Sequence, residues 1–218
     1  MLCVRWYLRY SLSNRDLEEI MLERGMQIDH STPNRWVLQY SPELDKRIRR
    51  HLQPAKSSYR IDETYIKVKG KWMFLYRAVD PKGQMIDFML SAKRDGRAAN
   101  GFFRRVILSE HAAPPYAMTV DKNPAFPIAF EEVKDEGLIP KGCKLRQIRY
   151  LNNIVEQDHR FIKRLVKPGM GFGTFWTAKN TLAGFEAMNM IRKGQVCGVP
   201  KGDILSQASF VSSIFGLV

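Results

Sequence analysis

The sequence predicts an α/β fold, a mixed sheet domain, preceded by a small helical module. The first observation is a change of period, because apolar residues recur at helical spacing within residues 2–40 and β-prone runs begin at Tyr59. The second is the order of the later elements, three strand-like runs followed by alternating helices and strands. The third is the length of 218 residues, which allows one full-sized core and one small module.

Residues 1–50 are predicted to form three short helices and the start of a linker. The second helix carries an apolar stripe, with Ser13 or Asn14 as its cap and Gly25 just beyond its end. The third begins near Ser31 or Thr32, which are residues that favour a helix N-terminus. A short helix, a tight turn with glycine and a further helix are typical of a helix-turn-helix DNA-binding module.

The third helix has an outer face that would read DNA if this interpretation holds. Its outward polar residues, and the predicted DNA contacts, are His30, Asn34, Arg35 and Gln39. The alternative is that these helices are a cap on the main domain, since helix pairs of this length are common. Residues 41–58 are expected to form a connecting helix and linker.

The main domain is predicted to span residues 55–200. Three β-prone runs come first, and the short turns between them favour antiparallel neighbours. The predicted strands are residues 59–70, 71–80, 84–91, 116–120 and 145–150, and the predicted helices are residues 97–110, 127–136, 152–166 (capped by Asn152 or Asn153) and 177–193. Ribonuclease-H-like domains have this order of elements.

The charge indicates a polyanionic partner. Lys and Arg number 35 against 22 Asp and Glu, which gives a formal net charge of +13. Nucleic acid is the first candidate and an anionic membrane surface the second. Residues 141–168 hold eight basic and two acidic side chains, whereas residues 1–50 carry nine and seven. The excess is therefore weak in the helical module and dense near residue 156.

Several classes of protein are excluded by composition. Cys3, Cys143 and Cys197 are too few and too widely spaced for a disulfide framework or a zinc site, so a cytoplasmic protein, nucleoid-associated when bound to DNA, is expected. The start lacks a basic-then-apolar leader, and no apolar run reaches the ~18–20 residues of a membrane span. The tail, residues 201–218, is expected to pack on the core or on a partner.

Three carboxylates fall where a metal site would need them. Asp62 lies in the middle of the first strand, Asp121 ends the strand at 116–120, and Glu156 lies in the first turns of the following helix. If the first and fourth strands are neighbours, Asp62 and Asp121 lie side by side, and three close carboxylates would repel each other without cations. Two Mg²⁺ ions, or Mn²⁺, would make this a phosphoryl-transfer site.

The simpler interpretation is that these acids fall at strand ends by chance. Two neighbouring acids are not expected to be ligands, on geometric grounds. Glu63 is expected to point away from Asp62 in a regular strand, and Asp158 to lie about 200° around the helix from Glu156.

The helix after residue 152 adds support for the functional interpretation. Glu156, Arg160, Lys163 and Lys167 follow i, i+4, i+7 and i+11, so they share one face. A solvated charged face would mix signs, but this one is basic apart from the glutamate. The stripe is suited to holding phosphates beside the metal site.

The residues together resemble transposases of the Asp-Asp-Glu (DDE) type from bacterial and archaeal insertion sequences, specifically insertion-sequence family six. The matching segments are VRWY at 4–7 with RDLEE at 15–19, HST at 30–32 with RW at 35–36, DETY at 62–65 with LYRAVD at 75–80, DKN at 121–123, RQI at 146–148 through to Lys163, and RKGQ at 192–195.

The resemblance implies a ribonuclease-H-like fold, two divalent cations, and cleavage and joining of double-stranded DNA at transposon ends and target. The catalytic and metal-binding residues would be Asp62, Asp121 and Glu156, and the basic residue seven positions on, Lys163, would contact DNA. Arg160, Lys167 and Lys122 are further expected DNA contacts. Because two DNA ends must be brought together, a homodimer or larger assembly is expected.

Two departures concern the helical module. Similar proteins begin some residues earlier, so the module is expected to be N-terminally shortened, and Pro33 and Asn34 replace an apolar and an aromatic or polar residue. Two other functions were weighed. A ribonuclease-H-like nuclease would give no strand-transfer products, and a catalytically silent transposase-derived protein would bind DNA without turnover.

Overall fold

The computed structural model describes residues 1–148, 153–167 and 169–217. The basic residue Arg149, the predicted strand end at 150 and the predicted cap Asn152 lie outside these residues. The chain forms two compact units: unit 1 comprises residues 1–52, 68–70 and 162–218, and unit 2 comprises residues 53–67 and 71–161. The predicted domain boundaries, near residues 50–55 and 200, stay a prediction.

Unit 2 is built on a five-stranded sheet with the order β3-β2-β1-β4-β5. Its strands are β1 (Ser58–Val68), β2 (Lys71–Val79), β3 (Met85–Ser91), β4 (Ala117–Val120) and β5 (Lys144–Gln147). β2 and β3 are antiparallel, whereas β4 lies parallel to both β1 and β5. A two-residue turn joins β1 to β2, and both of its residues, Lys69 and Gly70, have positive φ, as such a turn requires.

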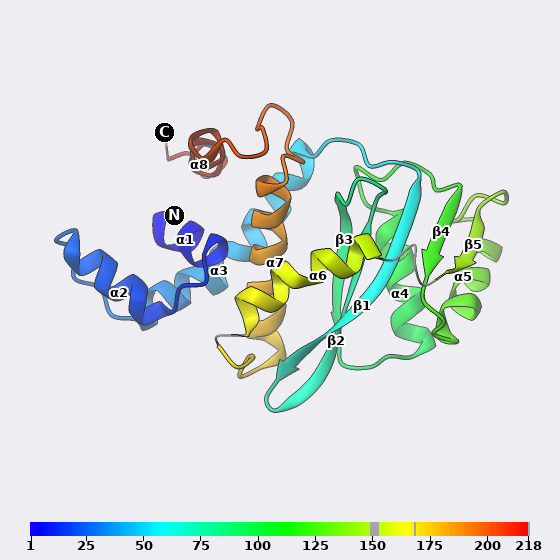
Figure 1. The fold of residues 1–218 in the computed structure, drawn as a ribbon, viewed down its shortest axis with the longest axis horizontal. Helices are drawn as coiled ribbons and strands as arrows, with labels where there is room; N and C mark the ends of the chain where they lie inside the picture. The colour runs from blue at the N-terminus through cyan, green and yellow to red at the C-terminus, as the bar shows by residue number, and fades with distance from the viewer. Residues whose placement is uncertain (149–152, 168, 218) are drawn as a thin grey trace. The chain divides into compact units, whose positions relative to one another are not determined.

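Helices cover both faces of this sheet (Figure 1). α4 (Gly96–Ile107) and α5 (Ala125–Asp135) pack on the face that carries Tyr59, Ile61 and Tyr76, where four buried phenylalanines complete the core. Asp95 starts α4 by accepting a hydrogen bond from the Ala98 N–H. The first residues of α6 (Asn153–Val166) lie on the other face, where Asp158 pairs with Arg77 of β2 at 2.5 Å.

The strand order and strand directions confirm the predicted mixed α/β, ribonuclease-H-like fold. Each predicted strand of unit 2 has its counterpart, displaced at its ends by a few residues. The strand predicted over 145–150 corresponds to β5, Lys144–Gln147. The helix predicted over 97–110 ends at Ile107, since Leu108 is already in a non-helical conformation.

Unit 1 contains α1 (Leu2–Arg9), α2 (Asn14–Glu23), α3 (Ser31–Ile48), a 3₁₀ turn η1 (Arg49–His51), α7 (Phe175–Arg192) and α8 (Ile204–Ser213). Ser13 caps α2 through a reciprocal capping box with Asp16, and Gly25 follows α2 with φ +74°. Both features were predicted. None of the helices that the structure describes is long and apolar enough to cross a bilayer.

The third helix differs from its prediction, because α3 continues through Pro42 to Ile48 and leaves no separate connecting helix after residue 41. Proline lacks the N–H that would bond to the carbonyl of Leu38. In the structure the Asn180 side chain donates a hydrogen bond to that carbonyl at 3.3 Å. A side chain 142 positions away in the sequence therefore supports the helix at this point.

α3 and α7 cross closely within unit 1. The crossing needs Gly184, because a Cβ there would lie 2.4 Å from Ser41 Oγ and 2.6 Å from Leu8 Cδ2. Tyr7 of α1 stacks on Phe185 with ring centroids 5.9 Å apart. The N-terminal helices are thus packed into one hydrophobic unit with α7.

The C-terminal tail packs against the end of α3. The Arg47 guanidinium donates a hydrogen bond to the Ile214 carbonyl at 2.7 Å and lies 4.6 Å from the centre of the Phe215 ring. His51 and Phe210 meet edge to face at 5.4 Å. A cation at the carbonyl end of α8 also complements the helix dipole.

Candidate active site

The parallel pairing of β1 with β4 brings Asp62 level with Asp121. Ser58 pairs with Ala117, and Arg60 pairs with Thr119, an offset of 59 residues. The same offset continued by two residues places Asp62 opposite Asp121, the first residue after β4. The neighbouring strands required by the sequence argument are therefore confirmed.

A third carboxylate joins them, and it is Glu63. Ligand oxygens of Asp62, Glu63 and Asp121 all lie within 4.8 Å of one another, and we call these three residues the acidic cluster. The Glu63 side chain is 2% exposed, against 16% for Asp62 and 30% for Asp121. Glu63 is not among the predicted ligands, because in a regular strand it points to the opposite face from Asp62. Its longer side chain nevertheless reaches Asp121 beyond the end of β4.

Glu156, the predicted third catalytic residue, is exposed on α6 and is not one of the acidic cluster. It lies one turn before His159, whose Nε2 is 3.3 Å from Asp62 Oδ2. Residues three apart on a helix are surface neighbours. Asp158, by contrast, is turned toward the sheet and paired with Arg77, as the helix geometry predicted.

Arg94, which follows β3, and Asn123 close a ring of hydrogen bonds around the acidic cluster. The Arg94 guanidinium bonds to Glu63 Oε1 and, at 3.0 Å, to Asp121 Oδ2. The Asn123 side chain donates to Glu63 Oε1 at 3.2 Å, and its backbone N–H donates to Asp121 Oδ1 at 3.0 Å. Both oxygens of Asp121 are thus oriented by residues that also hold Glu63. Arg94 is not predictable from the sequence, because no local pattern connects it to Asp121.

Burial and repulsion between carboxylates shift pKa values in this site. Burial first, and then the nearby Asp121 carboxylate, raise the pKa of Glu63 to about 7 against the opposing effect of Arg94. Burial also lowers the pKa of His159, although its contact with Asp62 acts in the other direction. Perturbed pKa values of this kind cluster at functional sites.

The residues present fit a divalent cation. Three carboxylates offer the oxygen ligands that Mg²⁺ and Mn²⁺ prefer. Glu63 Oε2 is buried and has no hydrogen-bond partner among the described residues, although a buried carboxylate oxygen ordinarily has one. A bound cation would satisfy that oxygen and remove the repulsion within the acidic cluster.

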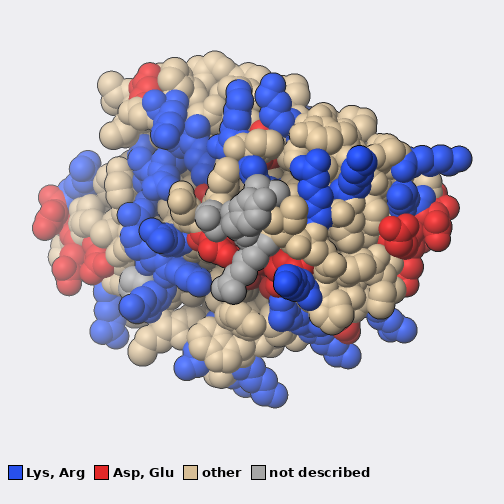
Figure 2. Space-filling model, turned by 45° about the vertical axis from the view of Figure 1, so that its right-hand side comes forward, with Lys and Arg blue, Asp and Glu red and all other residues tan. Residues whose placement is uncertain are grey.

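Basic side chains are exposed around the chain, and Lys and Arg outnumber Asp and Glu on the face shown in Figure 2. The predicted DNA contacts all have exposed side chains: Arg160 and Lys163 on α6, Lys167 just after it, Lys122 after β4, and His30, Asn34, Arg35 and Gln39 in or beside α3. Two of them already have protein partners. His30 Nδ1 lies 3.5 Å from Glu18 and 3.4 Å from Asp29, and Arg35 bonds to Thr32.

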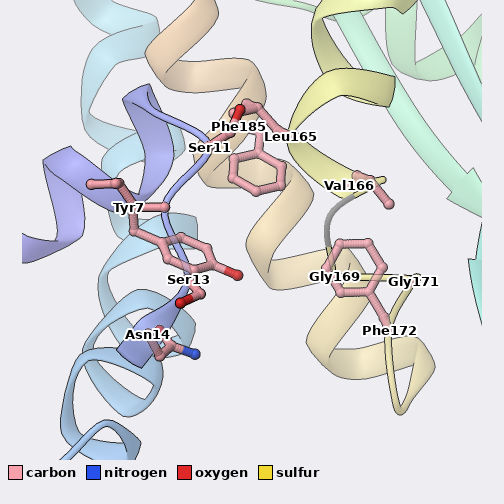
Figure 3. A pocket seen from close by; sticks show the side chains of 11 residues that line it. Tyr7, Ser11, Ser13, Asn14, Leu165, Val166, Gly169, Gly171, Phe172 and Phe185 are labelled. Carbon is pink, nitrogen blue, oxygen red and sulfur yellow. The ribbon is translucent and has the colours of Figure 1, made fainter. Parts of the chain in front are cut away.

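A separate cavity of about 210 Å³ lies within unit 1 (Figure 3). Tyr7, the residues between α1 and α2, and Phe172 line it, and Phe185 lies at its wall. Burial raises the pKa of Tyr7. The described lining residues include no Asp, Glu, His, Lys or Arg side chain.

Comparison with known proteins identifies the family to which the chain belongs. A family model described as a DDE domain matches residues 56–195, more than half of the chain and all of its carboxylate candidates. The chain belongs to the DDE transposases of insertion sequences. This transposase is 40% identical over 191 residues to the transposase for insertion sequence-like element IS431mec of Staphylococcus aureus, covering 87% of this chain and 82% of that protein.

A further relative is also an insertion-sequence transposase. The transposase for element IS257 in transposon Tn4003 of Staphylococcus aureus is also 40% identical over 191 residues. The predicted membership of insertion-sequence family six is therefore confirmed, and the chain is a DNA transposase. Among solved structures, the dimeric HTLV-2 integrase catalytic core domain in complex with magnesium matches 69% of this chain and 95% of its own, with TM-score 0.47 and 19% identity. The BIV integrase core matches 72% and 95%, with TM-score 0.47 and 16% identity.

Proposed function

We propose that this transposase cleaves and rejoins DNA strands at the ends of its insertion sequence, with Asp62, Asp121 and Glu156 as the catalytic carboxylates. The observation that carries the proposal is the register of β1 and β4, which puts Asp62 and Asp121 side by side at the carboxyl end of β4. Glu156 is included because it lies one helical turn from the histidine that contacts Asp62.

Two divalent cations, Mg²⁺ or Mn²⁺, would be held by these carboxylates. When bound, they would supply activation of a water or DNA 3′-hydroxyl and stabilisation of the leaving oxygen. The protein's own contribution is orientation. His159 holds Asp62, while Arg94 and Asn123 hold Asp121, so that the ligand oxygens are fixed before DNA arrives.

The DNA would be held by backbone phosphates near the site and read elsewhere. Arg160 and Lys122 are exposed in unit 2, while Lys163 lies one turn further along α6 and Lys167 follows the end of that helix. Contacts of this kind position double-stranded DNA without reading its sequence. We assign the selection of transposon ends to the exposed face of α3. Because two ends must be held together, the protein would act as a homodimer or larger assembly. This assembly would act on the nucleoid.

The test is single replacement of each carboxylate, Asp62→Asn, Asp121→Asn and Glu156→Gln. Binding of a labelled transposon-end duplex should persist, whereas Mg²⁺-dependent cleavage and strand-transfer products should both be lost. Exposed acids on α5 provide matched controls, Asp135→Asn and Glu131→Gln, which should retain full activity. Retained cleavage in all three site variants would refute the assignment.

Glu63→Gln separates the two candidates for the third carboxylate. Loss of cleavage in Glu156→Gln but not in Glu63→Gln would leave Glu63 as an orienting residue. The reverse result would make Glu63 the ligand and remove Glu156 from the site. Cleavage without strand-transfer products in the unmodified protein would indicate a nuclease.

A further inference from the structure

Exposed aromatic side chains cluster on the β1–β2 hairpin, which projects beyond α4 and α5 (Figure 1). Tyr65 lies 6.3 Å from Trp72, edge to face, and 5.5 Å from Phe74. Phe74 is partly buried and packs on the core, whereas Tyr65 is 50% and Trp72 61% exposed. We call Tyr65, Trp72 and Phe74 the aromatic ledge.

The geometry of the aromatic ledge leaves ring faces open. Phe74 ties the group to the core, and the edge-to-face arrangement of Tyr65 and Trp72 leaves ring surface available to a flat ligand. Contiguous exposed apolar surface of this kind marks an interaction site more often than isolated exposed residues do.

The charge around the aromatic ledge and its position on β1 indicate which class of ligand it would bind. Lys67 and Lys71 are exposed beside the ledge, and residues 65–79 contain no acidic side chain. Tyr65 follows Glu63 by two residues on the same face of β1, about 6.6 Å along the strand. The ledge therefore adjoins the acidic cluster and is flanked by groups that attract phosphate. A second copy of this chain would bring lysines against lysines.

We infer that the aromatic ledge stacks on unpaired bases of the DNA strand next to the phosphate under attack. The inference rests on the DNA strand cleavage proposed above and names the form of DNA that this part of the site takes. Every base has a π-face, so stacking on aromatic side chains tolerates any sequence. Lys67 and Lys71 hold the adjoining phosphates, and the bases lie over Trp72 and Tyr65.

The test compares two DNA ligands in fluorescence anisotropy with EDTA present. One is a fully paired duplex, and the other is the same duplex with a four-nucleotide single-stranded overhang. Trp72→Ala should weaken binding of the overhang duplex roughly tenfold and leave the paired duplex within about twofold. Trp72→Phe should restore most of the loss. Tyr116→Ala, a 57% exposed aromatic on the same unit, is the matched control and should change neither affinity.

Three outcomes would overturn the inference. Equal binding of the overhang duplex by Trp72→Ala and the unmodified protein would remove the stacking role while leaving the proposed function intact. Failure of the unmodified protein to bind either duplex would overturn both. A change of oligomeric mass in Trp72→Ala by light scattering, with DNA affinities unchanged, would assign the ledge to self-association.

Discussion

Gly184 provides the sharpest test of how unit 1 is packed. In Gly184→Ala the new Cβ would lie 2.4 Å from Ser41 Oγ and 2.6 Å from both Ser41 Cβ and Leu8 Cδ2. The Leu8 methyl can rotate away, but Ser41 Cβ is fixed to the α3 backbone. Overpacking of this kind costs up to about 3 kcal/mol, and alanine returns about 1 kcal/mol of helix propensity. The free energy of unfolding should therefore fall by about 2 kcal/mol.

Thermal unfolding followed by circular dichroism at 222 nm measures this effect. A loss of about 2 kcal/mol corresponds to a Tm lower by roughly 4–8 °C in a chain of this size. Gly101→Ala is the matched control, because Gly101 is also inside a helix but a Cβ there would meet nothing within 4 Å. Its Tm should rise by a few degrees, about 2–4 °C.

The double variant Ser41→Gly with Gly184→Ala completes a double-mutant cycle for the contact between these two residues. Because Ser41→Gly removes both clashing atoms of that residue, its cost in the Gly184→Ala background should be smaller than its cost alone. If Gly184→Ala were as stable as Gly101→Ala, the close crossing of α3 and α7 would be refuted.

Three further predictions concern unit 2 and the thiols. Arg77→Met should lower the free energy of unfolding by about 3–5 kcal/mol in urea titration, since it removes the guanidinium that pairs with the buried Asp158 carboxylate. Arg77→Met combined with Asp158→Leu should recover most of this loss, and no recovery would contradict the role of the buried pair. Arg94→Gln should lower the Tm in EDTA, because the acidic cluster loses the positive charge that bridges Glu63 and Asp121. Addition of MgCl₂ should raise the Tm of this variant by more than it raises the Tm of the unmodified protein. An equal rise would argue against Arg94 as the counter-charge of the acidic cluster. When the folded protein is treated with a thiol reagent and mapped by mass spectrometry, the exposed Cys197 should be labelled. Cys143, whose pKa burial raises to about 11, should be labelled only after denaturation. Labelling of Cys143 in the folded protein would contradict its burial in the core.

Much of the sheet domain was predictable because its signals are local. Alternation and turn residues located the strands, and the 59-residue spacing of Asp62 and Asp121 matches the register of β1 and β4. The same local reasoning was incomplete for Glu63. Alternation fixes the face from which a side chain starts, but not how far a glutamate reaches past the end of a neighbouring strand.

Other features depend on partners that are distant in the sequence. The third helix was expected to end before a connecting helix that starts at residue 41, but α3 continues through Pro42, where the Asn180 side chain supplies the donor that proline lacks. The packing of α7 with the N-terminal helices likewise depends on distant residues, because it needs the absence of a side chain at Gly184 where Leu8 and Ser41 approach.

The sequence alone determined the order of elements, the surplus of positive charge, the candidate carboxylates Asp62, Asp121 and Glu156, and the transposase family. Each of these depends on residue identity and spacing along the chain. Only the tertiary structure brought Glu63 and Arg94 to Asp121, and only it left Trp72 exposed beside that site. Such contacts depend on distances in space between side chains from different strands, and those distances are set by how strands and helices pack rather than by any local pattern.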